Sequence, residues 1–108
     1  MIDTTYIVIT DNSEEYIRDV LCSILLLSDN EELIIFDNHS TDNTVPIILE
    51  TIDPVLWIDE NERYKFFIGM QKEDIETIKN KLISKAIGKP IIIDKKERFD
   101  MKEVNIND

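Results

Sequence analysis

The chain alternates between short apolar runs typical of strands and segments whose apolar residues recur at helical spacing. The runs are rich in β-branched or aromatic residues, which favour strands, and they cover residues 5–10, 32–36, 55–58 and 90–94. A segment with helix signals separates most runs from the next. This order predicts an α/β fold, with a mostly parallel, Rossmann-like sheet, right-handed crossovers and helices on both faces.

The first helix is expected directly after the first run. Asn12 is a good N-cap residue, and Glu15 lies three residues later, as in a capping box. The apolar residues that follow recur at helical spacing, and they are Ile17, Val20, Leu21, Ile24 and Leu25. Cys22 lies among them, so we expect a buried structural thiol without chemistry of its own.

Three further segments complete the expected secondary structure. A short helix is predicted over residues 44–52, ended by Asp53 and Pro54. A longer helix is predicted from Ile75 to Ala86, because glycine and proline follow it. Residues 62–69 are interpreted as extended, and the charged tail from about residue 97 as a loosely ordered end.

Composition limits the class of protein. A length of 108 residues fits one domain, which we place over residues 1–108. The net charge of −11 repels phosphate backbones and anionic membranes, which argues against a nucleic-acid partner. The sequence contains no apolar run of transmembrane length and no signal-peptide pattern at its start, so we expect a soluble cytoplasmic protein.

Several motifs resemble one enzyme family. The stretch "YIVITDNSEEYIRDVLCSIL" followed by "ELIIFDNHSTDNT" resembles the start of family 2 glycosyltransferases. Further on, "KNKLISKAIGKPIIIDKK" is similar to the family's Arg-Asn helix, its Ala-x-Gly end and the strand that leads to a metal-binding Asp-x-Asp. The resemblance spans Tyr6 to about Lys96. It implies the N-terminal, nucleotide-sugar-binding half of a GT-A fold.

The resemblance assigns roles to the residues that follow the first two strands. Asp37 matches an aspartate that contacts the nucleotide base, and Thr10 and Asn12 match the strand end that flanks it. A carboxylate suits this task because it accepts a hydrogen bond from an imide N–H such as that of uracil. Asp37, Ser40 and Asp42 are equally suited to form a turn and to cap the next helix, and for the last two we favour capping. His39 is interpreted as a solvated loop residue.

The chain also departs from the family pattern. Where the family has Asp-x-Asp, this chain has Asp94, Lys95 and Lys96, so bound Mn²⁺ or Mg²⁺ is not expected. Lys79 replaces the family's arginine and loses its fork geometry. We expect Lys79, Asp94 and Lys96 to lie on the nucleotide side of the site. Lys96 either places positive charge near a diphosphate or is a solvated surface residue.

The expected function follows from these matches and departures. Family enzymes continue into an acceptor-binding half that holds the general base, and this half is missing from the 108 residues. We therefore predict a module that binds a uridine nucleotide or nucleotide-sugar, that is not catalytic alone, and that acts with another chain. The alternative is a non-enzymatic interaction or scaffold protein that has lost the ligand. An autonomous glycosyltransferase is the least favoured interpretation.

One strand raises the question of association. Residues 90–94 are expected at an edge of the sheet, where unpaired backbone groups invite another strand. Three arrangements would protect this edge: cover by residues 63–68 or by the tail, the charges of Lys95, Lys96 and Glu97, or pairing with another subunit as a homo-oligomer. Cover within the chain is the favoured arrangement.

Overall fold

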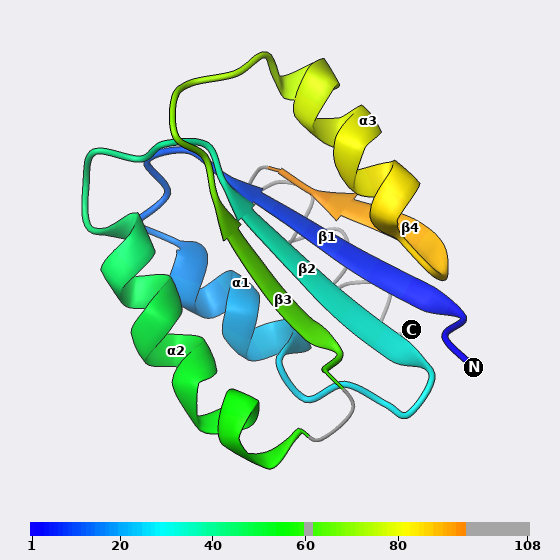
Figure 1. The fold of residues 1–108 in the computed structure, drawn as a ribbon. Coiled ribbons are helices and arrows are strands. Elements are labelled where there is room, and N and C mark those ends of the chain that lie inside the picture. Colours follow the sequence, from blue (N-terminus) through cyan, green and yellow to red (C-terminus); the bar gives the residue numbers. More distant parts are fainter. Residues whose placement is uncertain (60–61, 95–108) are drawn as a thin grey trace.

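The computed structural model describes residues 1–59 and 62–94. Seven elements follow in the order β1 (Thr4–Thr10), α1 (Ile17–Ile24), β2 (Glu31–Asp37), α2 (Thr44–Ile58), β3 (Tyr64–Ile68), α3 (Ile75–Lys85) and β4 (Lys89–Ile93). The strands form one parallel sheet in the order β3-β2-β1-β4 (Figure 1). The predicted α/β class and parallel sheet are confirmed.

Helices cover both faces of the sheet, as predicted. Alternate residues of β1 point to opposite faces. Val8 belongs to the core beneath α1 and α2, whereas Ile7 and Ile9 belong to the core beneath α3. Figure 1 shows α1 and α2 side by side on one face and α3 on the other. The fold therefore has three layers, and the carboxyl ends of all four strands lie along one edge.

The second helix is longer than predicted, and the expected strand over residues 55–58 is wrong. The α2 helix runs from Thr44 to Ile58 and includes Pro54, which is exposed. Its buried residues are Thr44, Ile48, Ile52 and Val55. This spacing keeps the apolar side chains on one helical stripe across Pro54. The third strand is instead β3, formed by part of the segment that was interpreted as extended.

The start of the first helix also differs from the prediction. The α1 helix begins at Ile17, and its N-cap residue is Tyr16, which makes no capping hydrogen bond through its side chain. Asn12 is not the cap, since it lies in the left-handed region with φ 49°. The prediction for Cys22 is wrong as well, because this thiol is exposed. It lies on the outward side of a helix whose buried residues are Ile17, Val20, Leu21 and Ile24.

The strand order identifies the two edge strands of the sheet. Among the described strands, β4 lies at one edge of the sheet, as expected, and β3 lies at the other. Residues 63–68 therefore lie at the far edge and do not cover β4, so that part of the prediction is wrong. The tail and Lys95, Lys96 and Glu97 lie outside the described residues. Among the described residues, no helix has the length and apolar character needed to cross a membrane.

Candidate functional site

Asp37, predicted to contact a nucleotide base, and Thr10, predicted to flank it, meet at the carboxyl edge of the sheet. Thr10 ends β1 and Asp37 ends β2, and the parallel register places them side by side. The Thr10 Oγ1 hydroxyl donates to Asp37 Oδ1 over 2.6 Å. Both residues are buried, with exposed fractions of 1% for Thr10 and 0% for Asp37. The site is thus centred on a cross-strand pair between neighbouring strands.

The carboxylate of Asp37 also holds the loop that follows it. The Ser40 backbone N–H donates to Asp37 Oδ2 over 2.8 Å, and the Ser40 hydroxyl donates to Oδ1 over 2.6 Å. Oδ1 therefore accepts two hydrogen bonds and Oδ2 accepts one from these residues. A carboxylate oxygen has two lone-pair sites, so Oδ2 keeps acceptor capacity for one more donor.

Asn12 joins the loop after β1 to the loop after β2. Its backbone N–H donates to Ser40 Oγ over 2.9 Å. Its side-chain Oδ1 accepts from the backbone N–H groups of Thr41, over 2.8 Å, and Asp42, over 3.3 Å. The exposed Asn12 thus lies beside the Thr10–Asp37 pair and ties its two loops together, instead of capping α1.

Asp42 supports the start of α2 from the position before the N-cap, which is Asn43 and not Asp42 as favoured from sequence. Its Oδ1 accepts from the Thr44 backbone N–H over 2.9 Å and from the Thr44 hydroxyl over 2.5 Å. Partial burial acts to raise the pKa of Asp42, but hydrogen bonds from Thr44 and from the Glu14 backbone outweigh it and lower the pKa. Ser40 instead turns back to Asp37, which argues against its capping role.

The loop between β3 and α3, residues 69–74, completes the edge. Asn38 Nδ2 donates to the Glu73 carbonyl, and the Glu73 N–H donates to Asn38 Oδ1, both over 3.0 Å. The Gly69 N–H donates to the Asp37 carbonyl over 2.8 Å. Lys72 forms an ion pair with Asp11, and both side chains are about half exposed. Sequence reasoning missed Asp11, Asn38, Lys72 and Glu73, although Asp11 and Asn38 directly follow strands.

A second group of predicted residues lies where β4 ends. Lys79 Nζ is 3.0 Å from Asp94 Oδ2 and 3.4 Å from Glu76 Oε2. The hydrogen bond to Asp94 raises the pKa of Lys79, so this side chain stays protonated. The Asp94 side chain is only 7% exposed. Lys79 and Asp94 therefore form one pair, while Lys96 lies outside the described residues.

The described residues do not fit a divalent metal. Over residues 1–59 and 62–94, no three His, Cys, Asp or Glu side chains are grouped so that they could hold an ion. Asp94 lies against the ammonium group of Lys79, and the sequence continues with two more lysines. Mg²⁺ and Mn²⁺ need several oxygen ligands, which Asp94 beside a lysine does not supply. His39 is exposed, as expected for a loop residue.

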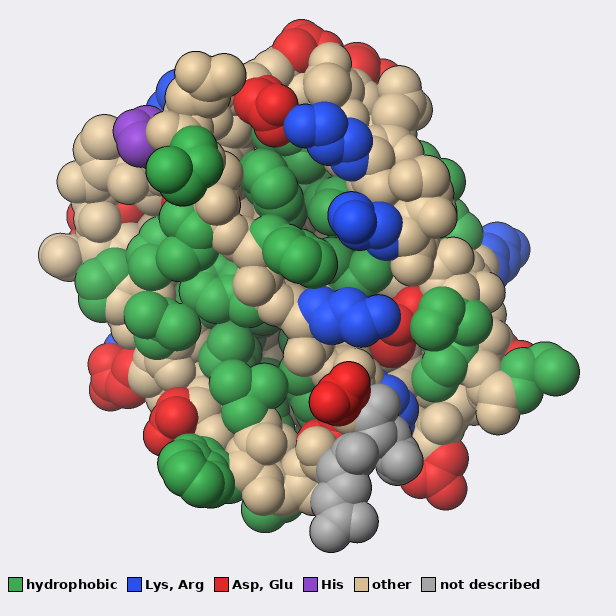
Figure 2. All heavy atoms as spheres, viewed as in Figure 1, with side chains coloured by type: hydrophobic (Ala, Val, Ile, Leu, Met, Phe, Trp, Pro, Cys, Tyr) green, Lys and Arg blue, Asp and Glu red, His purple; other side chains and the backbone are tan. Residues whose placement is uncertain are grey.

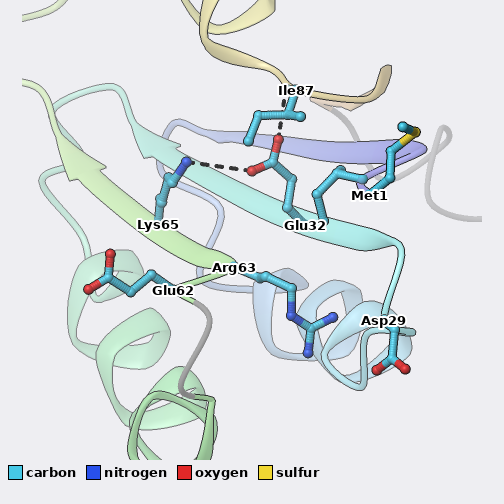
Figure 3. A pocket seen from close by; sticks show the side chains of 8 residues that line it. Met1, Asp29, Glu32, Glu62, Arg63, Lys65 and Ile87 are labelled. Atoms are coloured by element: carbon cyan, nitrogen blue, oxygen red, sulfur yellow. Dashed lines mark hydrogen bonds and ion pairs between the residues drawn. The ribbon is translucent and has the colours of Figure 1, made fainter.

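A cavity of about 470 Å³ lies at the opposite edge, near the amino ends of β2 and β3 (Figure 3). Glu32, which is 1% exposed, accepts from the Thr5 hydroxyl over 2.7 Å and from the Ile87 N–H over 2.9 Å. Figure 3 shows Lys65 and Glu32 pointing toward each other, with Nζ 3.5 Å from Oε1. Because this carboxylate already joins β1, β2 and the segment before β4, we assign it a structural role.

Comparison with protein families gives one match. The model of the glycosyl transferase family 2 matches residues 5–93, which include both strands of the Thr10–Asp37 pair, the loop over residues 69–74, and Lys79. The comparison with curated proteins found no match.

Proposed function

We propose that the chain, which belongs to glycosyltransferase family 2, binds a uridine nucleotide or the nucleotide part of a nucleotide-sugar at its Thr10–Asp37 edge. The observation that carries the proposal is the register pair at the carboxyl ends of β1 and β2, with Asn12 beside it. Ligands of open α/β sheets bind at this edge. The family match covers all three residues.

Recognition of the base would use the remaining acceptor capacity of Asp37. The imide N–H of uracil would donate to Oδ2, which in the closed loop accepts one hydrogen bond, from the Ser40 N–H. Because Asp37 is fully buried, the loop over residues 38–42 must open before a base can reach it. Opening breaks the hydrogen bonds that Ser40 and Asn12 make. We therefore expect weak binding, since the ligand must offset this cost.

The phosphate groups would meet lysine side chains in place of a metal. Lys72 is about half exposed and is held by Asp11 next to Asn12. Lys79 stays protonated beside Asp94, and Lys96 follows β4 in the sequence. Ammonium groups stabilise a diphosphate by charge without the geometry that a metal imposes. Binding should accordingly be independent of Mn²⁺ and Mg²⁺.

Sugar transfer by the 108 residues alone is not part of the proposal. Two lysines stand at the positions that follow Asp94, and the Asp94 carboxylate faces Lys79. A chain without a metal loses a source of several kcal/mol of stabilisation at the leaving diphosphate. Transfer would require a general base and charge stabilisation from outside these 108 residues.

A scaffold without ligand is the second candidate, and one observation favours it. Asp37 is fully buried and accepts three hydrogen bonds from Thr10 and Ser40. A carboxylate in this state stabilises a turn without needing a ligand. The first candidate predicts a nucleotide site at Asp37 once the loop over residues 38–42 opens, whereas the scaffold candidate predicts no binding there. A matched set of variants separates the two.

Calorimetric titration with uridine, UMP and UDP, with and without Mn²⁺, tests the site. For the wild type we expect dissociation constants of about 10 μM to 1 mM, with UDP bound more tightly than uridine. Asp37→Asn removes an acceptor and should weaken binding of all three ligands at least about tenfold. Ser40→Ala removes one hydrogen bond that holds the loop closed over Asp37, so this variant should bind the ligands equally or more tightly. Asp29→Asn, an exposed change at the opposite edge, is the control.

Two results would contradict the proposal. Equal binding by the wild type and by folded Asp37→Asn would exclude the site, and absence of binding in the wild type and Ser40→Ala would favour the scaffold. Melting curves of each variant confirm that it is folded. Metal-dependent turnover of a UDP-sugar by the purified chain would overturn the expectation that it is inactive alone.

A further inference from the structure

The face of the sheet that carries α3 is only partly covered. The core beneath α3 contains residues of β1 and β2, with Ile92 of β4 packed against it, but no residue of β3. On the opposite face, Tyr64 and Phe66 of β3 pack against the core beneath α1 and α2. Parallel sheets are normally covered on both faces. Among the described residues, no helix lies beside α3 over β3, and Figure 1 shows no helix in front of this strand.

The uncovered surface is an apolar groove. A hollow of about 240 Å³ lies between α3 and the strands, with Phe36, Phe67, Ile78 and Leu82 among its lining residues. Phe67 is 39% exposed and the neighbouring Ile68 is 52% exposed. A typical small-molecule site has a volume of roughly 300 to 1,000 Å³, so this hollow is smaller than such a site. It suits side chains projecting from a larger body better than it suits a whole metabolite.

Lysines frame this groove in a strongly acidic chain. Lys81 and Lys85 lie one helical turn apart on α3 and contribute to its lining. Lys85 Nζ is 5.7 Å from the centre of the Phe67 ring, and Lys81 is 54% exposed although it pairs with Glu73. Figure 2 shows a row of basic side chains beside hydrophobic ones on this face. The surface thus combines an apolar floor with positive charge, against a net charge of −11.

We propose that this groove, defined by Phe36, Phe67, Ile68, Lys81 and Lys85, binds an acidic amphipathic helix of another protein. The apolar face of such a helix would cover Phe67 and Ile68, as α1 and α2 cover the opposite face, and its Asp or Glu residues would meet Lys81 and Lys85. A second copy of this chain fits less well, since each copy spreads eleven net negative charges over its surface. The inference does not depend on nucleotide binding.

Two synthetic peptides test the charge preference. Both are helical and share one leucine-rich face, but one carries Glu and the other Lys along its flanks. Each is titrated into the full 108-residue chain with ¹⁵N resonances as the readout. We expect the Glu-flanked peptide to bind at least about tenfold more tightly, with shifts at Phe67, Ile68, Lys81 and Lys85. The double variant K81E/K85E should reverse the preference, and Lys89→Glu, an exposed change on β4, should keep it.

A second pair of variants tests the apolar floor. Phe67→Ser and Ile68→Ser should each weaken the Glu-flanked peptide, and Ile68→Ser is the safer variant because this side chain is half exposed. Equal affinity for both peptides, or no binding of either, overturns the proposal. So does a dimer in light scattering that Ile68→Ser dissociates, because a second copy would then fill the groove. Peptide binding that appears only after removal of residues 95–108 overturns it too, since the occupant would be the chain's own tail.

Discussion

Thr10 and Asp37 end neighbouring parallel strands and are joined by a hydrogen bond of 2.6 Å from the Thr10 hydroxyl to the Asp37 carboxylate. Thr10→Val keeps the shape but removes this donor, and we expect a loss of about 1–3 kcal/mol in the free energy of unfolding because the acceptor is buried. Thr10→Ser retains the hydroxyl and should lose less. Urea denaturation of the three proteins measures the difference, and a larger loss for Thr10→Ser than for Thr10→Val would mean that the methyl group matters more than the hydroxyl.

Glu32 should contribute more to stability than any exposed acid of the chain. Glu32→Ala leaves the Thr5 hydroxyl and the Ile87 N–H without their acceptor, so we expect a loss of about 1–3 kcal/mol or more. Lys65→Met should cost far less, because the lysine side chain is 39% exposed and its pair is screened. Chemical denaturation of the wild type and of both variants measures the loss in the free energy of unfolding. A larger loss for Lys65→Met would show that the ion pair dominates.

Asp42 should give the protein an acid-sensitive component of stability. The pKa of Asp42 is lowered on folding from 3.8, so its contribution is complete above pH 3.8 and is lost as the pH falls through the folded-state pKa. Asp42→Asn removes this dependence while leaving an acceptor for Thr44. The stability difference between wild type and variant should be constant at neutral pH and should shrink in acid. A difference that stays constant down to pH 2, roughly, would contradict the assignment.

Pro54 lies inside α2, where it lacks the N–H that an interior helical residue donates to the carbonyl four residues earlier. Pro54→Ala restores this donor, so we expect the variant to be more stable, by up to about 3 kcal/mol. Thermal unfolding measures the change. Destabilisation would indicate that the proline makes contacts that an alanine cannot replace. Leu56→Ala, a neighbouring exposed change, serves as the control.

The same proline explains the main error in predicting the fold from sequence. Asp53 and Pro54 resemble a helix end, and the β-branched and aromatic run after them resembles a strand. The helical stripe of Thr44, Ile48, Ile52 and Val55 continues through that point, and burial of Val55 against the sheet outweighs the local cost of proline. Where hydrophobic spacing and local propensity agreed, as in β1, β2 and α3, the prediction is confirmed.

The site was only partly predictable for a different reason. Thr10 and Asp37 were predicted from the resemblance to family 2 glycosyltransferases, and the parallel register places them side by side at the carboxyl ends of their strands. The contacts of Asn38 with Glu73 and of Asp11 with Lys72 join residues 35 and 61 positions apart. Such contacts depend on where the loop over residues 69–74 returns to the sheet, and a loop has no periodic pattern that fixes its path.

The central position of β1 has a consequence for how the chain acquires its structure. Thr4 of β1 pairs with Lys89 of β4. The β1 strand is therefore made before the other described strands, but it has neighbours on both sides only after β4, the last of them, has been made. Strands β1, β2 and β3 with α1 and α2 can assemble from consecutive segments. The contact between β1 and the residue just before β4 joins residues 83 positions apart in the sequence, so β4 can pair with β1 only after α3 and β4 have been made, and folds that depend on such distant contacts form slowly. Until then, Ile7 and Ile9 lie on an open face, where an arrested nascent chain would be prone to aggregate.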